Sequence, residues 1–183
     1  MTKNAWAVAL LGAIVGFACT VVSQTPPSFG SACSMVSART ISKVQGAPFV
    51  SNTSSVHDDG RFHVATCYYK LQPEAQSVSL EIIAPSKSGA SSPATLWREK
   101  FRSDDRRRGS HDVRVDGEVD AEKDSQPVHI DNLGDDAFWV NTGRDGALYL
   151  LSGNKIIRLS LGGKAAQNEK KARAIQITGS LLK

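Results

Sequence analysis

The most regular stretch of the sequence runs from residue 128 to residue 161 and reads VHIDNLGDDAFWVNTGRDGALYLLSGNKIIRLSL. It holds four short runs of apolar and β-branched residues, separated by residues that favour turns. The runs are residues 128–130, 137–140, 147–151 and 155–161. Gly153-Asn154 favours a tight hairpin between the last two runs. The stretch therefore predicts a meander of antiparallel strands.

Two further strands are predicted upstream of this meander. The side chains of residues 62–71 alternate between two faces, as a strand requires. The first face carries Phe62, Val64, Thr66 and Tyr68, and the second carries Ala65, Cys67, Tyr69 and Leu71. Residues 78–84 alternate as well, and Pro73-Glu74 predicts the turn of a hairpin. Residues 48–60 are polar and rich in turn formers, so we expect a loop there.

Two helices are predicted from their start and stop signals. Ser37 is a suitable N-cap for a helix over residues 38–45, and Gly46 is a suitable residue to end it. Ser92-Pro93 supplies the cap and the first-turn proline of a second helix. The inner face of this second helix is expected to carry Leu96, Trp97 and Phe101.

A third helix, rich in basic residues, is predicted over residues 164–178 after the breaker Gly162-Gly163. We expect it to turn Ala165, Ala172 and Ile175 inward. Helices before, between and after groups of antiparallel strands indicate the α+β class. We therefore expect an antiparallel sheet of about five strands with the helices packed on one face.

The N-terminus has the pattern of an export signal. Lys3 precedes an apolar run of 18 residues, from 5 to 22, and the small residue Ser23 follows it. We expect cleavage after Ser23, so that residues 1–23 are a signal peptide and residues 24–32, rich in Pro and Ser, are a flexible tether. Residues 33–183 then form a single α+β domain.

Two alternatives to cleavage after Ser23 stay open. The apolar run is long enough for an uncleaved signal anchor. Cys19 is also a candidate for lipidation, although Phe17 and Gly16 fit a lipoprotein signal poorly. The chain is therefore expected to be periplasmic or extracellular, and attached to a membrane only if Cys19 is lipidated or the signal is uncleaved.

Cysteine usage agrees with export. Removal of Cys19 with the signal leaves the pair Cys33 and Cys67. An even number of cysteines in an oxidising compartment predicts a disulfide between them. The alternative of two free buried thiols fits an exported protein less well.

Several of these features together resemble a class of known domains. They are Cys33 before Met35-Val36, the helix that ends at Gly46, Cys67-Tyr68-Tyr69, and the LGDDAFW stretch of residues 133–139. In this combination the chain resembles small exported bacterial domains, often lipoproteins and mostly of unknown function. Some of these are similar to the Mog1/PsbP-like fold. The resemblance implies an α+β module with a cysteine bridge, and it implies no catalytic residue.

A basic cluster marks the region around the second predicted helix. Its members are Arg98, Arg102, Arg106, Arg107 and Arg108, with Lys100 beside them. Such a cluster could contact lipid headgroups, an anionic glycan or an acidic protein of the envelope. Glu99, Asp104 and Asp105 offer local partners instead. We expect the mixed charges of residues 103–127 to form a mobile loop.

The net charge of the whole chain is only +4, which does not argue for nucleic acid as a partner. His57, Asp58, Asp59 and His63 are metal-ligand types at close spacing, but Asp58-Asp59-Gly60 is also ordinary turn chemistry. We expect no metal and no cofactor.

No recognised catalytic motif is present in the sequence, neither a nucleophile elbow, nor an H-E-x-x-H helix, nor a phosphate-binding glycine loop. The sequence therefore predicts an exported, non-catalytic binding or accessory module of the cell envelope or extracellular space. One alternative is a small secreted hydrolase in which His63, His111 or His129 meets a distant Ser or Asp in a deep cavity. Another is a structural accessory of an envelope complex.

Overall fold

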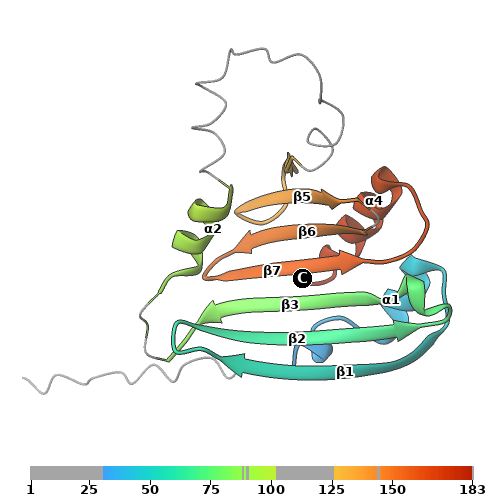
Figure 1. Cartoon of the computed structure of the whole chain (residues 1–183), viewed down its shortest axis with the longest axis horizontal. Coiled ribbons are helices and arrows are strands. Elements are labelled where there is room, and N and C mark those ends of the chain that lie inside the picture. Colours follow the sequence, from blue (N-terminus) through green and yellow to red (C-terminus); the bar gives the residue numbers. More distant parts are fainter. Residues whose placement is uncertain (1–30, 88, 90, 102–125, 144, 183) are drawn as a thin grey trace, which may run out of the picture.

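The computed structural model describes residues 31–182 except 88, 90, 102–125 and 144 (Figure 1). The predicted signal peptide, Cys19, most of the predicted tether and most of the predicted charged loop lie outside these residues. Ala32, expected in the tether, belongs to the first ordered turn and is fully buried. The described chain forms an antiparallel sheet with helices, the predicted α+β class.

The sheet has seven strands among the described residues, whereas about five were expected. Their bounds are β1 Phe49–Asp58, β2 Phe62–Leu71, β3 Val78–Pro85, β4 Val128–His129, β5 Asp136–Thr142, β6 Asp145–Ser152 and β7 Lys155–Leu161. Their spatial order is β1-β2-β3-β7-β6-β5-β4, and every neighbouring pair is antiparallel. Two meanders, β1 to β3 and β4 to β7, are thus joined side by side through β3 and β7.

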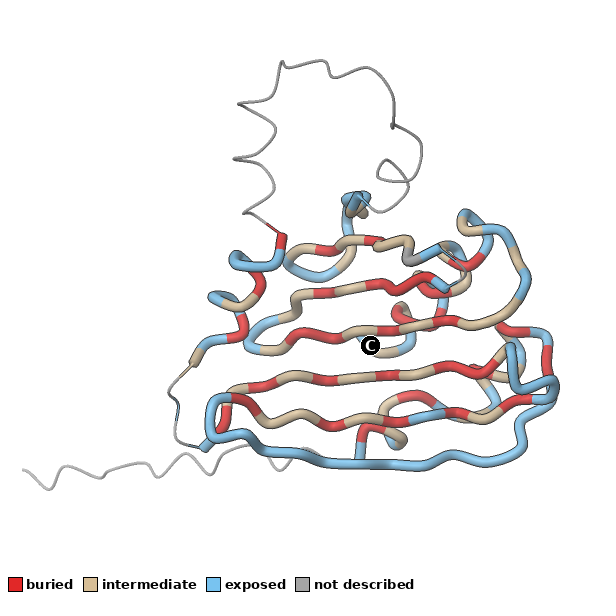
Figure 2. The backbone as a smooth tube through the Cα atoms, viewed as in Figure 1, coloured by how far each residue is buried: buried red, intermediate tan, exposed pale blue. Residues whose placement is uncertain are grey.

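The prediction of a loop over residues 48–60 was wrong, because strand β1 occupies most of this segment. It pairs with β2 over most of its length, with an irregularity between Phe49 and Ser51. All ten of its residues are exposed, because β1 is the outer strand and no layer of the described chain covers it (Figure 2). A strand that buries neither face needs no apolar alternation, so the pattern that reveals β2 is absent from β1.

The helices begin and end close to the predicted residues. They are α1 Ala38–Gln45, α2 Pro93–Phe101 and α4 Gln167–Thr178, with two short 3-10 turns, η1 Ala32–Ser34 and η2 Glu74–Gln76. The Ser37 hydroxyl accepts from the Thr40 N–H at 3.1 Å, and Gly46 ends α1 with φ of 67°. Ser92 accepts from the Ala94 N–H at the start of α2. The predicted caps of these two helices are thereby confirmed.

Helix α4 starts at Gln167 rather than at residue 164, and it shows a different face to the sheet than predicted. Lys170, Ala174 and Ile177 are buried, whereas Ala172 is exposed and Ile175 is half-buried. The three buried positions lie on one helical face, since they are four and three residues apart. A buried lysine stands on that face, so a prediction based on apolar residues alone placed the face wrongly.

Helices α1 and α4 cover one face of the sheet, which we call the covered face. Val36 and Ile41 pack there with the inward residues of the strands, such as Leu80 and Leu159, to form the main core. The core also takes in Tyr69 and Trp139 and so extends across both meanders. Arg173 of α4 donates to the carbonyl and side-chain oxygens of Gln45, which ties the two helices together.

Helix α2 lies on the other face of the sheet, which we call the open face, so the expectation that the helices share one face was wrong. Its Trp97 and Phe101 pack on Ile156, whereas the adjacent Ile157 belongs to the main core. Successive side chains of a strand point to opposite faces, so the two clusters lie on opposite sides of the sheet. The predicted inner residues of α2 are correct, but the sequence holds no signal for which face they meet.

The predicted disulfide joins Cys33 to Cys67, with Cα atoms 5.0 Å apart. It links η1 to β2 on the covered face. Next to it the Tyr69 hydroxyl donates to the carbonyl oxygens of Val36, at 2.8 Å, and Cys33, at 3.3 Å. A covalent bond and a buried hydrogen-bonded ring therefore hold the first turn of the domain against β2.

Loss of the disulfide should destabilise the protein. Cys33→Ser opens a loop whose ends are 34 residues apart, and we expect a free energy of unfolding about 2–5 kcal/mol lower. Urea unfolding measures the change. Wild-type protein unfolded in reductant should show the same loss, and equal stability with and without reductant would contradict the prediction.

Tyr69 should make stability fall at high pH. Burial raises the pKa of its hydroxyl above the ordinary value of 10.0, so folding favours the neutral form. The unfolded chain then loses its proton first as pH rises through about 10, and the stabilisation from Tyr69 declines towards the higher folded pKa. Tyr69→Phe should lower stability at neutral pH by about 1–2 kcal/mol, because two carbonyls lose a donor.

The same variant tests the alkaline effect. Unfolding curves between pH 8 and about pH 11 should fall less steeply for Tyr69→Phe than for the wild type. Parallel curves for the two proteins would show that Tyr69 does not contribute to this pH dependence.

Candidate functional site

The part of the open face that α2 leaves uncovered carries a polar hollow. The strand registers place Tyr68, Ser79, Ser160 and Ala147 in one row across β2, β3, β7 and β6. Arg158 lies two residues before Ser160 in β7 and therefore points to the same face. These five residues line one hollow of about 400 Å³, which we call the trough. This volume lies in the range of small-ligand sites.

The trough exists because small side chains stand between larger ones. Two serines and an alanine form the floor of the row, while the Tyr68 ring rises from β2 and Arg158 from β7. At one end the turn η2 comes close to the strand end, where Gly162 faces the carbonyl of Ala75. A side chain at Gly162 would place its Cβ 2.3 Å from that oxygen, so glycine allows this approach. The close approach makes η2 a wall of the trough.

Two cationic groups flank the aromatic ring beside the trough. Arg158 donates from Nε to the Tyr149 hydroxyl at 3.0 Å, and its guanidinium carbon lies 5.7 Å from the ring centre. Lys100 of α2 places its ammonium 4.8 Å from the centre of the same ring. The ring attracts both cations, so it holds two positive charges at the edge of the trough.

One hydroxyl on the trough floor has an unused hydrogen-bonding group. Ser160 Oγ is closed to solvent and has no hydrogen-bond partner within the described part of the chain. A buried hydroxyl without a partner costs free energy comparable to a lost hydrogen bond. The hydrogen-bonding capacity of this hydroxyl is thus unused among the described residues, although the atom itself lies beneath the trough surface.

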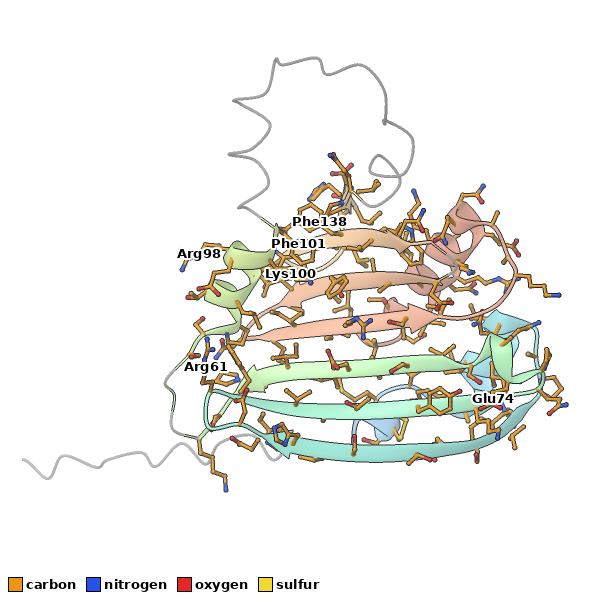
Figure 3. The ribbon with its side chains drawn as sticks, viewed as in Figure 1. Arg61, Glu74, Arg98, Lys100, Phe101 and Phe138 are labelled. Carbon is orange, nitrogen blue, oxygen red and sulfur yellow. A yellow bond between two sulfur atoms is a disulfide. The ribbon has the colours of Figure 1, made fainter. Side chains whose placement is uncertain are left out.

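Acidic residues stand around the cations. Glu74 of η2 and Asp145 at the start of β6 line the rim, and Figure 3 shows Glu74 at the end of the sheet away from α2. Glu81 of β3 stands next to Arg158 in the strand register. The trough therefore offers a cationic side towards α2 and an acidic end towards η2.

The predicted basic cluster is placed only in part. Arg98 is exposed on the outer side of α2, and its guanidinium donates to the Thr95 hydroxyl at 3.3 Å. Arg102, Arg106, Arg107 and Arg108 lie outside the described residues. Lys100 points the other way, towards Phe101 and the sheet (Figure 3). The structure thus separates Lys100 from Arg98 and brings it to the trough side instead.

The four metal-ligand types at residues 57–63 do not converge. His57 pairs with Val64 and Asp58 pairs with His63, so the two histidines point to opposite faces of the sheet. Asp58 accepts from the Gly60 N–H, and Asp59 accepts from those of Arg61 and Phe62. The carboxylates thereby serve the β1–β2 turn. In the described chain no group of three or more His, Cys, Asp or Glu side chains is placed to hold a metal ion.

Two of the three histidines of the hydrolase alternative are described, and each meets a carboxylate. His63 Nδ1 lies 3.6 Å from Asp58 Oδ2, and the Ser86 side chain also bonds to Asp58. Asp58 is then the central group, whereas a hydrolytic triad needs the histidine between serine and aspartate. His111 lies outside the described residues.

His129 belongs to a structural network at the other end of the sheet. Its ring nitrogens lie 3.0 Å from Asp131 and 3.1 Å from Asp136. Asp136 also accepts from the Trp97 ring nitrogen at 2.8 Å. The network ties α2 to β5 and β4, and no serine takes part in these recorded contacts.

Comparison with known proteins adds no functional assignment. No known protein family and no curated protein matches the chain. The chain is similar in structure to a GTP-binding regulator from Thermotoga maritima, with 10% identity and a TM-score of 0.35 over 78% of this chain and 87% of that one. A TM-score this low supports no conclusion, and the Mog1/PsbP-like resemblance stays a prediction. None of the helices in the described ranges is long and apolar enough to cross a membrane.

The trough was not predicted from the sequence. Its residues come mainly from four strands and one turn, and those on the strands have an ordinary explanation as the outward side of a strand. One signal was available. The residues of β7 that point to the open face are Ile156, Arg158 and Ser160. A cationic side chain followed by a small hydroxyl side chain on one face of a strand indicates a polar patch there.

The β1–β2 turn should contribute to acid sensitivity. Two backbone N–H groups hold the pKa of Asp59 below its ordinary value of 3.8. The unfolded chain then binds a proton first as pH falls, so the stabilisation is present above about pH 4 and is lost below it. Asp59→Asn keeps the acceptor oxygen and should flatten the stability curve between about pH 5 and pH 2. Identical acid slopes for both proteins would contradict this role.

Proposed function

We propose that the chain is an exported, non-catalytic binding module whose ligand occupies the trough on the open face. The observation that carries the proposal is the Arg158 guanidinium beside Tyr68 and a floor of small side chains in a solvent-accessible hollow. Most of the remaining sheet surface is explained by packing, since α1 and α4 cover one face and α2 covers one end of the other. The trough is a polar part of the open face that α2 does not cover.

The ligand class follows from the groups in and beside the trough. A guanidinium and a nearby ammonium favour an anionic group, and carboxylate or sulfate matches the planar fork of arginine. The hydroxyls of Tyr68 and Ser79 favour a ligand that itself carries hydroxyl groups. The exposed Tyr68 ring offers an apolar surface against which a sugar ring can lie. An acidic sugar unit of a glycan meets all these requirements.

Two features support binding rather than catalysis. No histidine or cysteine is among the residues that line the trough, so it lacks the histidine base of a Ser-His-Asp or Cys-His hydrolase. The trough is also shallow and open, whereas hydrolysis from a distant Ser, His and Asp was expected in a deep cavity.

Export rests on the disulfide and on the predicted signal peptide. The Cys33–Cys67 bond is of the kind that persists in oxidising compartments. An acidic glycan is also a ligand of the cell surface, so compartment and ligand agree.

Titration with oligosaccharides tests the proposal. A glucuronic acid oligosaccharide should shift the backbone amide signals of β3, β6 and β7 around the trough, and a neutral glucose oligosaccharide of equal length should not. Arg158→Gln should weaken binding of the acidic sugar about tenfold or more, because a charged hydrogen bond is lost. Arg158→Lys should recover only part of it, since lysine lacks the planar fork.

Arg98→Gln is the matched control, because it removes an equal charge from α2 outside the trough. It should leave the affinity nearly unchanged. Loss of binding in Arg98→Gln but not in Arg158→Gln would move the site to the predicted basic cluster. Absence of any amide shift in the trough would overturn the proposal.

A further inference from the structure

Among the residues that the structure describes, the outer strand β1 is an open edge of the sheet. It is ten residues long and reads FVSNTSSVHD, and all of its residues are exposed. Half of its backbone N–H and C=O groups point away from β2, as in any outer strand. An exposed edge of this kind is a template on which a further strand can pair.

The two edges of the sheet differ in this respect. The opposite edge is formed by β4, which has only two residues, Val128 and His129. A very short edge strand is one of the usual means by which proteins prevent pairing. Proline, lysine and β-bulges protect other edge strands in the same way. β1 is long and contains no proline and no lysine, and its single irregularity lies at its start.

We propose that β1 pairs antiparallel with β1 of a second copy of this chain, which joins two sheets into one. This inference is independent of the trough and goes beyond the proposed function. The strand is compatible with itself, since its regular part consists mainly of Ser, Thr and Asn, whose hydroxyls and amides pair well across strands.

Charge also permits this pairing. The single carboxylate of β1 is Asp58, at its very end. In a two-fold arrangement that sets Ser54 opposite the same residue of the second copy, the two Asp58 side chains lie about 27 Å apart along the strands. That separation exceeds the Debye length of about 8 Å in physiological salt, so the two charges do not oppose association.

A second copy fits the edge better than an unrelated peptide. Strand addition gains its specificity from pockets that accept alternate side chains of the added strand. The trough and two other hollows contain no residue of β1, and the other two hollows are lined around Gln45 and Arg173 and around Trp139 and Lys171. Pairing of identical strands needs no such pocket, and a two-fold axis stops growth at a dimer because the β4 edge is blunt.

Sedimentation velocity over a range of protein concentrations tests the proposal. The wild type should show a reversible, concentration-dependent dimer. Thr53→Lys/Ser55→Lys and Thr53→Glu/Ser55→Glu each place like charges opposite one another at the two-fold axis. Each variant alone should associate at least about tenfold more weakly than the wild type.

An equimolar mixture of the two variants should restore the dimer, because lysines then face glutamates whichever of the neighbouring registers is adopted. Both substitutions stand on the exposed outer strand, and the thermal midpoint of each variant shows that it is folded. Asn154→Lys/Ser180→Lys adds the same charge at exposed positions outside β1 and should leave the dimer intact.

Three results would overturn the proposal. They are a wild type that stays monomeric at its highest soluble concentration, a lysine variant that dimerises like the wild type, and a mixture that stays monomeric although both variants are folded. A wild type that stays monomeric would leave β1 available for pairing with a strand from a different protein.

Discussion

The pairing of β3 with β7 holds this structure together. Val78 to Ile83 align with Leu161 to Ile156 in an unbroken antiparallel register, although the two segments lie far apart in the sequence. Everything else depends on this contact. The core beneath it needs Leu80 and Leu159 side by side, and the trough above it needs Ser79 beside Ser160. Loss of this pairing would separate two meanders, each with half a core and half a site.

Local signals in the sequence were sufficient for most individual elements. The bounds of β2, β7 and α1 agree with the prediction, because clear alternation or residues such as Ser37 and Gly46 mark them. The disulfide was also predictable, since Cys33 and Cys67 are the two cysteines that follow the predicted signal peptide. For the strands and the helix, the feature that decides the element lies within a few residues of it. For the disulfide, it lies in a single pair of cysteines.

The remaining features depend on contacts that the sequence does not encode locally. β1 is held by backbone bonds to β2 and buries no side chain, so no hydrophobic pattern records it. Helix α2 packs on Ile156, which points to the open face, and not on Ile157, which points to the covered face. The two residues are adjacent and equally apolar, so the sequence does not indicate the side. The trough depends on which strands become neighbours. Arg158 and Tyr149 meet only because β6 and β7 pair, and Lys100 reaches them only because α2 crosses to the open face.

The position of the Cys33–Cys67 bond has a mechanical consequence. Tension applied to the chain on the N-terminal side of Cys33 passes through the covalent bond directly into β2. The segment between the two cysteines, which includes α1 and β1, is thereby excluded from the path of the force. Such a domain could be pulled from its N-terminal end while its outer strand keeps its shape. The first element to feel the load would be β2, which β1 and β3 hold on its two sides.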